Sequence, residues 1–347
     1  MPLVGYGIWK VPAENAAESV YNAIKLGYRH IDGAYDYTNS AEAGQGVKRA
    51  IDDGLIKRED IFITSKLWNN YHAHEHAIAA AHRENEAWGL GYLDLYLIHF
   101  PIAQKYIDPS VIKYPCFWED AARTKIGTLV KVPMIETWKA LETLAQTDSN
   151  PQGILKSIGV ANCNAQLLSE LQAQAKVPLS VLQIELHPYL VQPQLIQMAQ
   201  ENGIAVTAYS SFGPQSFLEL GNARATNVEP LLTHPVITKI AEKHGKTAAQ
   251  VLLRWATQRD IIVIPKSNNT ERLAQNLDSV SFDLTKEELE AISALDKGLR
   301  FVRCSPTSLP FPVAPCVCRR ISLRSVLTVT TLQNDPSTFD PPIRIFD

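Results

Sequence analysis

The sequence predicts a single α/β domain: a (β/α)8 TIM barrel of eight parallel strands with helices around them. Three observations support this. Short apolar runs alternate with longer segments of helical period along most of the chain. The short runs are continuously apolar, as is usual for parallel strands that are buried on both faces. The length of 347 residues suits one large barrel.

The predicted elements follow one another in a regular order. The strands are Val4–Ile8, Arg29–Ile31, Ile61–Thr64, Leu93–Ile98, Ser157–Val160, Leu182–Glu185, Ala205–Tyr209 and Ile262–Ile264. The helices between them include Ala13–Leu26, Ala41–Asp52, His74–Trp88, Ile135–Leu144, Ala165–Gln174, Gln194–Asn202 and Ala248–Gln258. An open doubly wound sheet usually carries a glycine-rich phosphate turn after its first strand. The closed barrel is favoured because Gly5 and Gly7 lie within a predicted strand and no third glycine follows in register.

Two long connections interrupt this order. One runs from Pro101 to about Val132, and the other from Ser210 to about Pro230. Connections of this length are usually functional or disordered. Both would follow the C-terminal ends of strands, which is the face where barrel enzymes build their active sites.

Composition argues against several classes of partner. Hydrophobic residues make up 46% of the chain and charged residues 20%, the balance of a globular protein with a sizeable core. The net charge of −3 and the absence of any basic run argue against nucleic acid or a membrane as the main partner. No apolar run reaches about 18 residues, and the N-terminus lacks the features of a signal peptide. The five cysteines indicate neither a disulfide framework nor a metal site. We therefore expect a cytoplasmic protein, a monomer or homodimer, that acts on a small molecule.

Four polar residues follow three consecutive predicted strands. Asp32 and Tyr37 come after the second strand, Lys66 after the third and His99 after the fourth. Because neighbouring strands of a barrel end side by side, we expect these residues to converge on one mouth. Each alone is more often structural, in a buried ion pair or at a strand end. Four compatible residues on successive strands favour a catalytic site.

This set can protonate a carbonyl oxygen. A tyrosine with its ordinary pKa of about 10 is a poor acid at neutral pH unless its anion is stabilised. Lys66 would place a positive charge beside Tyr37, and Asp32 would hold that lysine charged. A neutral His99 would donate a hydrogen bond to the carbonyl oxygen. Hydride must then come from a cofactor, because no side chain can supply it.

Seven stretches of the chain resemble the aldo-keto reductase family, and most closely its fungal xylose reductases. They are GYRHIDGAYDYTN, IFITSKLWNN, LDLYLIHFP, SIGVAN, LQIELHPYL, AYSSFGPQSFLEL and IPKSNNTERLAQNL. The resemblance runs in order from residue 4 to about residue 301. It implies that Tyr37 is the general acid, that Lys66 and Asp32 tune it, and that His99 orients the substrate. The implied reaction is reduction of an open-chain aldose, such as D-xylose to xylitol.

The second half of the chain carries the residues expected to bind the cofactor. Lys266, Ser267 and Arg272 stand where the eighth strand ends and a helix begins, and the charges of Lys266 and Arg272 suit the 2′-phosphate of NADPH. A solvated helix start is the alternative. The resemblance implies further contacts from Asn162, Gln183, Tyr209, Ser211, Phe212, Gln215, Ser216, Leu218, Glu219, Asn268, Glu271, Gln275 and Asn276. Among these, Asn268, Glu271 and Glu219 can accept hydrogen bonds from the hydroxyls of the adenosine ribose, so NADH is a compatible second cofactor.

The resemblance also implies particular roles. Tyr209 would stack on the nicotinamide, Asn162 and Gln183 would bind its carboxamide, and residues 211–218 would wrap the pyrophosphate. Family members usually have serine where this chain has Ala161. One hydrogen bond, worth about 0.5–1.5 kcal/mol, is therefore expected to be missing.

A second group of residues is expected to bind substrate. Trp9, Trp68 and Phe100 would line the mouth together with His99, and aromatic walls of this kind suit many aldehydes. Asp36 is more informative, because a carboxylate beside Tyr37 can accept hydroxyls from a polyol chain. Its alternative role is that of an ordinary residue in a surface turn. In the family a C-terminal loop brings an asparagine to the sugar, and the corresponding residue here is Asn334.

Both ends of the chain depart from the family pattern. The chain starts inside the expected first strand, without the preceding β-hairpin of related enzymes, so exposed apolar side chains are expected there. In xylose reductases the segment similar to residues 298–301 continues directly into Asn-Asp-Pro, which occurs here only at residues 334–336. We therefore divide the chain into a barrel (1–301), a non-native insertion that resembles a retained intron (302–333) and a C-terminal tail (334–347).

Two other functions stay open. A broad-specificity NADPH-dependent aldehyde or ketone reductase would not prefer polyhydroxylated substrates over simple apolar aldehydes. A barrel that binds NADPH without turnover is the other alternative, and the intact set of four polar residues argues against it.

Overall fold

The computed structural model describes residues 1–218 and 220–302. Glu219, Asn334 and the predicted insertion and tail beyond Val302 lie outside the described residues. The strands form one parallel sheet in the order β1 to β8. They are β1 (Tyr6–Gly7), β2 (His30–Asp32), β3 (Phe62–Leu67), β4 (Leu95–Ile98), β5 (Ile158–Ala161), β6 (Val181–Glu185), β7 (Ala205–Tyr209) and β8 (Ile261–Val263).

The two edges of the sheet meet. Val4 forms a parallel bridge with Val263, and the backbone N–H of Gly5 donates to the carbonyl oxygen of Val263 at 2.8 Å. The N–H of Gly7 donates to the carbonyl oxygen of Pro265 at 3.3 Å. These bonds close the sheet, and the predicted (β/α)8 barrel is confirmed.

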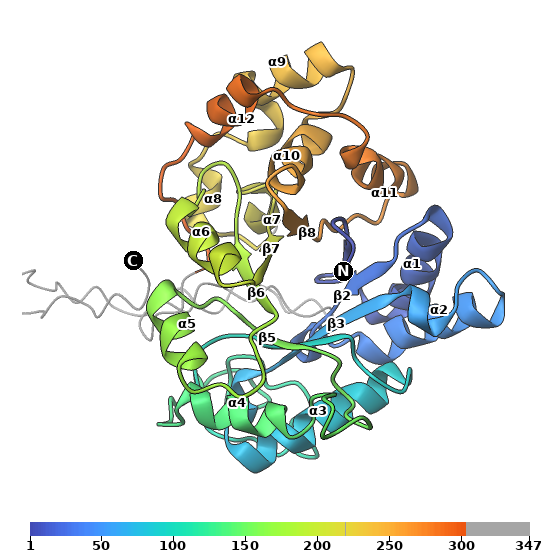
Figure 1. Ribbon diagram of the computed structural model, residues 1–347, viewed down its shortest axis with the longest axis vertical. Coiled ribbons are helices and arrows are strands. Elements are labelled where there is room, and N and C mark those ends of the chain that lie inside the picture. The colour runs from blue at the N-terminus through green and yellow to red at the C-terminus, as the bar shows by residue number, and fades with distance from the viewer. Residues whose placement is uncertain (219, 303–347) are drawn as a thin grey trace, which may run out of the picture.

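Helices surround the strands (Figure 1). They are α1 (Ala13–Leu26), α2 (Ser40–Asp52), α3 (His74–Trp88), α4 (Met134–Glu142), α5 (Ala165–Gln172), α6 (Pro193–Glu201), α7 (Gln215–Leu218), α8 (Ala223–Thr226), α9 (Pro235–His244), α10 (Ala248–Thr257), α11 (Thr270–Leu277) and α12 (Lys286–Ser293). Single 3-10 turns lie at η1 (Tyr35–Tyr37), η2 (Arg58–Asp60), η3 (Asn69–Tyr71), η4 (Leu231–Thr233) and η5 (Asp278–Val280).

Helix α1 shows how the sequence specifies these elements. Its buried residues, Ala16, Val20, Ala23 and Ile24, recur at the spacing that places them on one face of a helix. Glu14 in the first turn and Lys25 in the last turn complement the helix dipole. Gly27 ends the helix with a φ of 113°, a conformation that costs glycine little. The apolar face of α1 therefore packs inward, and the chain turns back toward β2.

The inside of the barrel is apolar at one end and polar at the other. Side chains of a strand alternate between its two faces, and a separate apolar cluster contains Leu95, Leu97, Ala161 and Val181. Residues two positions apart on a strand share a face. Gln183 follows Val181 on β6 by two positions, and His99 follows Leu97 of β4 by two positions, so both lie on the same inner face as this cluster. Polar groups thus gather at the C-terminal ends of the strands, where the catalytic residues were predicted.

The structure corrects several predicted boundaries. β3 runs to Leu67, so Lys66 lies within this strand and not after it. β1 is only Tyr6–Gly7, shorter than predicted. The connection after β7 contains α7 and α8. The tertiary hydrogen bonds that decide these points are not visible in a local apolar pattern.

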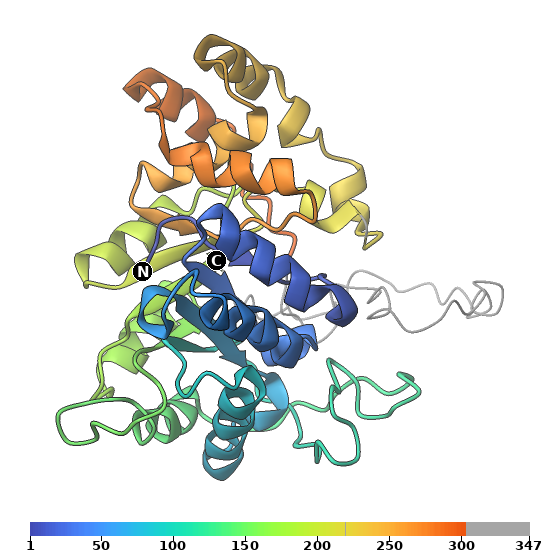
Figure 2. The same ribbon diagram turned by 90° about the vertical axis from the view of Figure 1, so that its right-hand side faces the viewer.

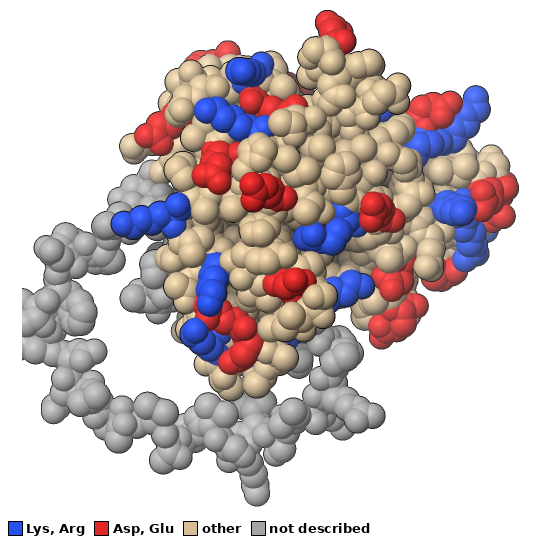
Figure 3. All heavy atoms as spheres, turned by 90° about the horizontal axis from the view of Figure 1, so that it is seen from below, with Lys and Arg blue, Asp and Glu red and all other residues tan. Residues whose placement is uncertain are grey.

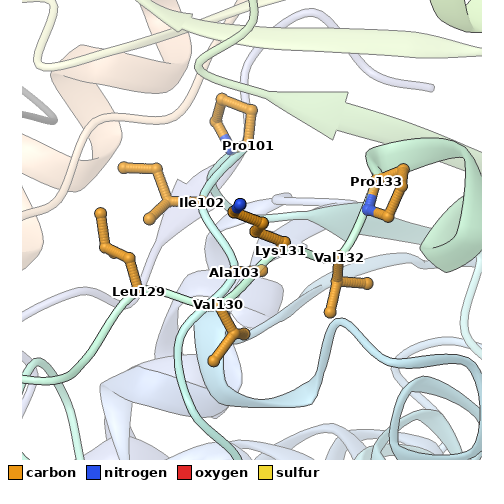
Figure 4. Close-up of a pocket in the computed structure, with 8 residues that line it drawn as sticks. All are labelled: Pro101, Ile102, Ala103, Leu129, Val130, Lys131, Val132 and Pro133. Atoms are coloured by element: carbon orange, nitrogen blue, oxygen red, sulfur yellow. The ribbon is translucent and has the colours of Figure 1, made fainter.

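The connection between β4 and α4 extends from the body of the barrel (Figure 2). Antiparallel bridges Gln104–Leu129 and Trp118–Ile126 give it the form of an irregular hairpin. A shallow pocket between its two legs is lined by residues 101–103 and 129–133 (Figure 4). This pocket contains none of the four predicted catalytic residues.

The surface carries mixed charge. On the face shown in Figure 3, acidic and basic side chains are interspersed and separated by uncharged ones. Among the described residues, no helix combines the length and apolar character needed to cross a bilayer.

Candidate active site

The four predicted catalytic residues meet at the mouth of the barrel. Lys66 Nζ lies 2.6 Å from Asp32 Oδ1 and donates to the carbonyl oxygen of Gly33 at 2.8 Å. The same ammonium donates to the Tyr37 hydroxyl at 3.2 Å. The rings of Tyr37 and His99 are 5.8 Å apart between centroids. Lys66 and Asp32 are fully buried, so water screens their interaction little.

The fold places each residue by a different local feature. Asp32 is the last residue of β2, and η1 turns the chain immediately afterwards so that Tyr37 faces back over the strand ends. Lys66 points along the interior from β3. His99 follows β4, and its carbonyl oxygen accepts a hydrogen bond from Asn162 Nδ2 at 2.9 Å.

Burial and charge keep Tyr37 protonated. Burial raises the pKa of Tyr37 well above its ordinary value, and the carboxylates of Asp32 and Asp36 raise it further. The pKa of Tyr37 stays raised although the ammonium of Lys66 lies 3.2 Å from its hydroxyl. The pKa of Lys66 is lowered by burial, and the Asp32 carboxylate opposes that change. Tyr37 is therefore a neutral phenol at physiological pH, and Lys66 is placed beside any negative charge that forms on its oxygen.

His99 is held as a neutral imidazole. Burial lowers its pKa well below the ordinary value, and the charge of Lys66 lowers it further. Its ring stacks on Phe100 at 4.8 Å and meets Trp68 edge-on at 5.3 Å. A neutral imidazole carries one N–H donor. His99 can thus orient a carbonyl oxygen without competing with Tyr37 as the acid.

Aromatic residues predicted to bind substrate lie beside the catalytic residues: the rings of Trp68 and Phe100 both contact that of His99. Trp68 packs against Phe100 and against Phe117 of the β4–α4 connection, with ring centroids 5.8 and 5.0 Å apart. Trp9 is half-buried and packs against Phe217, with ring centroids 6.4 Å apart. The sequence interpretation missed Phe117, because nothing local shows that the long connection returns to the site.

Asp36 lies at the same mouth beside a residue that was not predicted. Cys116 Sγ donates to Asp36 Oδ2 at 3.8 Å, and the carbonyl oxygen of Cys116 accepts from Trp68 Nε1 at 2.7 Å. Burial raises the pKa of Asp36 to about 7, although Cys116 and the positive charge of Arg123 act in the opposite direction. Asp36 therefore changes its charge near neutral pH.

Three of the predicted cofactor residues are connected to one another or to the catalytic residues. Gln183 Nε2 donates to Asp32 Oδ2 at 2.7 Å, a contact that the sequence interpretation did not include. Tyr209, the last residue of β7, donates to Asn162 Oδ1 at 2.6 Å. Asn162 has a positive φ of 59°, which turns its side chain toward His99 and Tyr209.

The remaining predicted cofactor residues lie in two segments. The segment after β7 contains Ser211, Phe212, Gln215, Ser216 and Leu218. Lys10, which follows β1, donates through Nζ to the carbonyl oxygen of Ser216 at 3.0 Å. The others, Lys266, Ser267, Asn268, Glu271, Arg272, Gln275 and Asn276, lie after β8 and along α11. Asn268, Glu271 and Arg272 are exposed, whereas Ser267 and Asn276 are buried.

The groups in these two segments, after β7 and after β8, suit the phosphates of a dinucleotide cofactor. The Ser211 hydroxyl is buried and has no hydrogen-bond partner within the described residues. Helix N-termini commonly bind phosphate, and α11 begins in the segment after β8 with Arg272 in its first turn. The side chain of Asn269 accepts the Arg272 N–H at 2.9 Å and so caps this end of the helix. Within residues 1–218 and 220–302, no group of three or more His, Cys, Asp or Glu side chains is arranged to hold a metal ion.

Residues 3–297 match the sequence model of the aldo/keto reductase family. This chain belongs to the aldo/keto reductase family. The family and the fold that the sequence predicted are thereby confirmed, and the chain is an oxidoreductase.

Related proteins agree with this assignment. An NAD(P)H-dependent pentose reductase of Pyricularia oryzae is 59% identical, over all of this chain and 96% of that protein. A probable NAD(P)H-dependent D-xylose reductase of Emericella nidulans is 56% identical, over 87% of this chain and 92% of that protein. Among solved structures, a Bombyx mori aldo-keto reductase in complex with NADP is 35% identical with a TM-score of 0.74, covering 87% of this chain and 92% of that one.

Proposed function

We propose that this member of the aldo/keto reductase family reduces open-chain aldoses, converting D-xylose to xylitol with NADPH, and that it also accepts NADH. The observation that carries the proposal is the contact of Lys66 with both Asp32 and Tyr37 beside a neutral His99. The names of the fungal relatives support the substrate and the cofactor.

The proposed mechanism assigns one task to each catalytic residue. NADPH, when bound, would supply the hydride for the carbonyl carbon. Tyr37 gives its proton to the carbonyl oxygen, and the charge left on the phenol oxygen is stabilised by Lys66, 3.2 Å away. Asp32 holds Lys66 in place, and the N–H of His99 orients the carbonyl oxygen.

Cofactor binding is assigned to the two segments that flank the mouth. Residues 211–218 would cover the pyrophosphate, while Lys266 and Arg272 would neutralise the 2′-phosphate. Tyr209 would stack on the nicotinamide. Because Asn162 is engaged by Tyr209 and His99, and Gln183 by Asp32, each amide has only part of its hydrogen-bonding capacity for the carboxamide.

Sugar recognition is assigned to Asp36 at the rim. An ionised carboxylate beside Tyr37 can accept two hydroxyls of a polyol chain, and Trp9, Trp68 and Phe100 would enclose its carbon skeleton. Asn334 would add a contact from the C-terminal part of the chain. The same apolar wall supports a second candidate, a broad-specificity aldehyde or ketone reductase, for which Asp36 would be unimportant.

The remaining assignments complete the proposal. The enzyme would act in the cytoplasm as a monomer or homodimer. The barrel would comprise residues 1–301, followed by the insertion 302–333 and the tail 334–347. Sequencing of messenger RNA across the codons for 302–333 tests the insertion, and reads that all include this segment would contradict a retained intron.

The direct test is NADPH oxidation by the purified full chain with D-xylose and, in parallel, with benzaldehyde. Turnover of both substrates, lost in Tyr37→Phe, is the expected result. Turnover of benzaldehyde alone would favour the broad-specificity reductase. A folded protein that turns over neither would refute the proposed reaction.

A further inference from the structure

Two buried ionisable residues near the mouth have no task in the mechanism. Glu185 is the last residue of β6, and His187 follows two residues later; both are fully buried. His187 Nε2 lies 2.9 Å from Glu185 Oε1. Burying a carboxylate is costly unless its hydrogen bonds are satisfied, so the other partners of Glu185 indicate what it does. We call Glu185 and His187 the C-terminal anchor.

Glu185 binds the backbone where the barrel ends. The N–H of Phe301 donates to Glu185 Oε1 and the N–H of Val302 donates to Oε2, both at 2.8 Å. Gln192 strengthens this connection, because its Nε2 donates to the Glu185 carbonyl oxygen at 2.6 Å and its Oε1 accepts from Arg300 at 2.6 Å. Hydrogen bonds to a carboxylate are roughly twice as strong as neutral ones. Residues 300–302 are thus fixed relative to β6.

Phe301 in turn contacts the segment proposed to cover the pyrophosphate. We call residues 211–218 the β7 loop. The Phe301 ring stacks on Phe217 of this loop, with centroids 5.0 Å apart and planes 28° apart. Both rings are buried, and Phe217 also packs against Trp9 at 6.4 Å. The inner side of the β7 loop therefore rests on a side chain whose backbone Glu185 holds.

His187 contacts the same loop at its first turn. A Cβ atom built on Gly213 would lie 3.5 Å from His187 Cγ and Nδ1, so the turn lies directly against the imidazole. Gly213 has a φ of +57°, which glycine adopts at little cost. The His187 and Phe301 rings are 5.4 Å apart. The imidazole thus fills the space between the start of the β7 loop and the ring that supports its end.

We propose that Glu185 and His187 are positioning residues that hold the β7 loop closed through Phe301 and Phe217, and so set how long NADPH stays bound. This inference rests on the proposed function, in which the β7 loop covers the cofactor. A segment opens locally at lower cost when it has few buried contacts, so the buried contacts described above, which connect this loop to β6, oppose its opening. Neither residue of the anchor needs to touch the cofactor to act in this way.

The test measures NADPH dissociation from the full-length protein by stopped-flow fluorescence, with excess NADP⁺ added to trap the freed site. Glu185→Gln weakens the two backbone hydrogen bonds, and Phe301→Leu removes the ring stack while keeping an apolar side chain. Each change is expected to raise the dissociation rate about tenfold, which corresponds to ~1.4 kcal/mol. Phe301→Leu keeps the test valid if Glu185→Gln fails to fold.

Asp94→Asn is the matched control. Asp94 is also a buried carboxylate that accepts a backbone N–H, from Ile63 at 3.0 Å, but it lies at the N-terminal ends of the strands. The Asp94→Asn substitution should lower the free energy of unfolding and leave the NADPH dissociation rate unchanged. The inference is wrong if Glu185→Gln and Phe301→Leu dissociate NADPH at the wild-type rate, or if Asp94→Asn accelerates it equally. If either result is found while the wild-type protein binds and oxidises NADPH, the proposed function stays intact. A wild-type protein that binds no NADPH would refute both the proposed function and this inference.

Discussion

Replacing Lys66 by methionine separates its contribution to stability from its contribution to catalysis. The ammonium is fully buried, 2.6 Å from Asp32. Methionine fills a similar volume without charge, so the Asp32 carboxylate would be left buried with Gln183 Nε2, at 2.7 Å, as its remaining side-chain donor within the described part of the chain. The variant therefore loses a charge partner and the donor to Tyr37 together.

The expected magnitude follows from this geometry. Removing one partner of a buried ion pair costs about 3–5 kcal/mol. Since Asp32 keeps the hydrogen bond from Gln183, we expect the lower end, about 3 kcal/mol of the free energy of unfolding. The double variant Asp32→Asn/Lys66→Met leaves no uncompensated charge and should recover most of that loss. Its kcat should stay at least about a hundredfold below wild type, because no cation then stabilises the Tyr37 oxygen.

The assays are urea unfolding followed by tryptophan fluorescence, and steady-state kinetics with benzaldehyde. Stability is expected to fall in the single variant and to return in the double variant, while activity stays low in both. A double variant as unstable as Lys66→Met would show that uncompensated charge is not the cause. A double variant with wild-type kcat would show that Tyr37 does not need the ammonium.

Three further predictions concern individual side chains. Tyr37→Phe should lower kcat by about 10²–10⁴-fold with an unchanged Kd for NADPH in fluorescence titration; an unchanged kcat would exclude Tyr37 as the acid. The pKa of Asp36 is raised to about 7, so the acceptor carboxylate is present above pH 7 and lost below it. The KM for D-xylose should rise as pH falls through 7, while the KM for benzaldehyde, and the xylose profile of Asp36→Asn, should not follow this change. Arg272→Ala should raise the Kd for NADPH about tenfold, the loss of a charge-assisted hydrogen bond, and leave the Kd for NADH unaltered; equal effects on both would exclude contact with the 2′-phosphate.

The strand order and the meeting of the catalytic residues could be predicted from the sequence because both depend on local signals. Continuous apolar runs mark buried strands, and a parallel barrel places the ends of successive strands side by side. Asp32, Lys66 and His99 therefore had to lie near one another once the barrel was recognised. The boundary at Lys66 was wrong because β3 continues through polar residues that pair with β4.

Contacts between distant parts of the chain could not be predicted in the same way. Gln183 reaches Asp32 across the inside of the barrel, and Glu185 meets Phe301 over 116 residues. Cys116 reaches Asp36 only because the β4–α4 connection folds back on itself. Each of these contacts depends on the diameter of the barrel or on the path of a long connection. The local pattern of apolar residues in the sequence predicts neither.

The seam between β1 and β8 has a consequence for how the chain is made. Tyr6 on β1 donates to the carbonyl oxygen of Ser267, a residue 261 positions later. During synthesis at about 5–20 residues per second, the partner of β1 emerges only after roughly 13–50 s. Until then one edge of β1 has unpaired N–H and C=O groups, a template for pairing with other chains. The nascent barrel therefore passes through an open state in which its first strand needs protection, and closure of the ring also completes the backbone around Ser267, where the phosphate of the cofactor is proposed to bind.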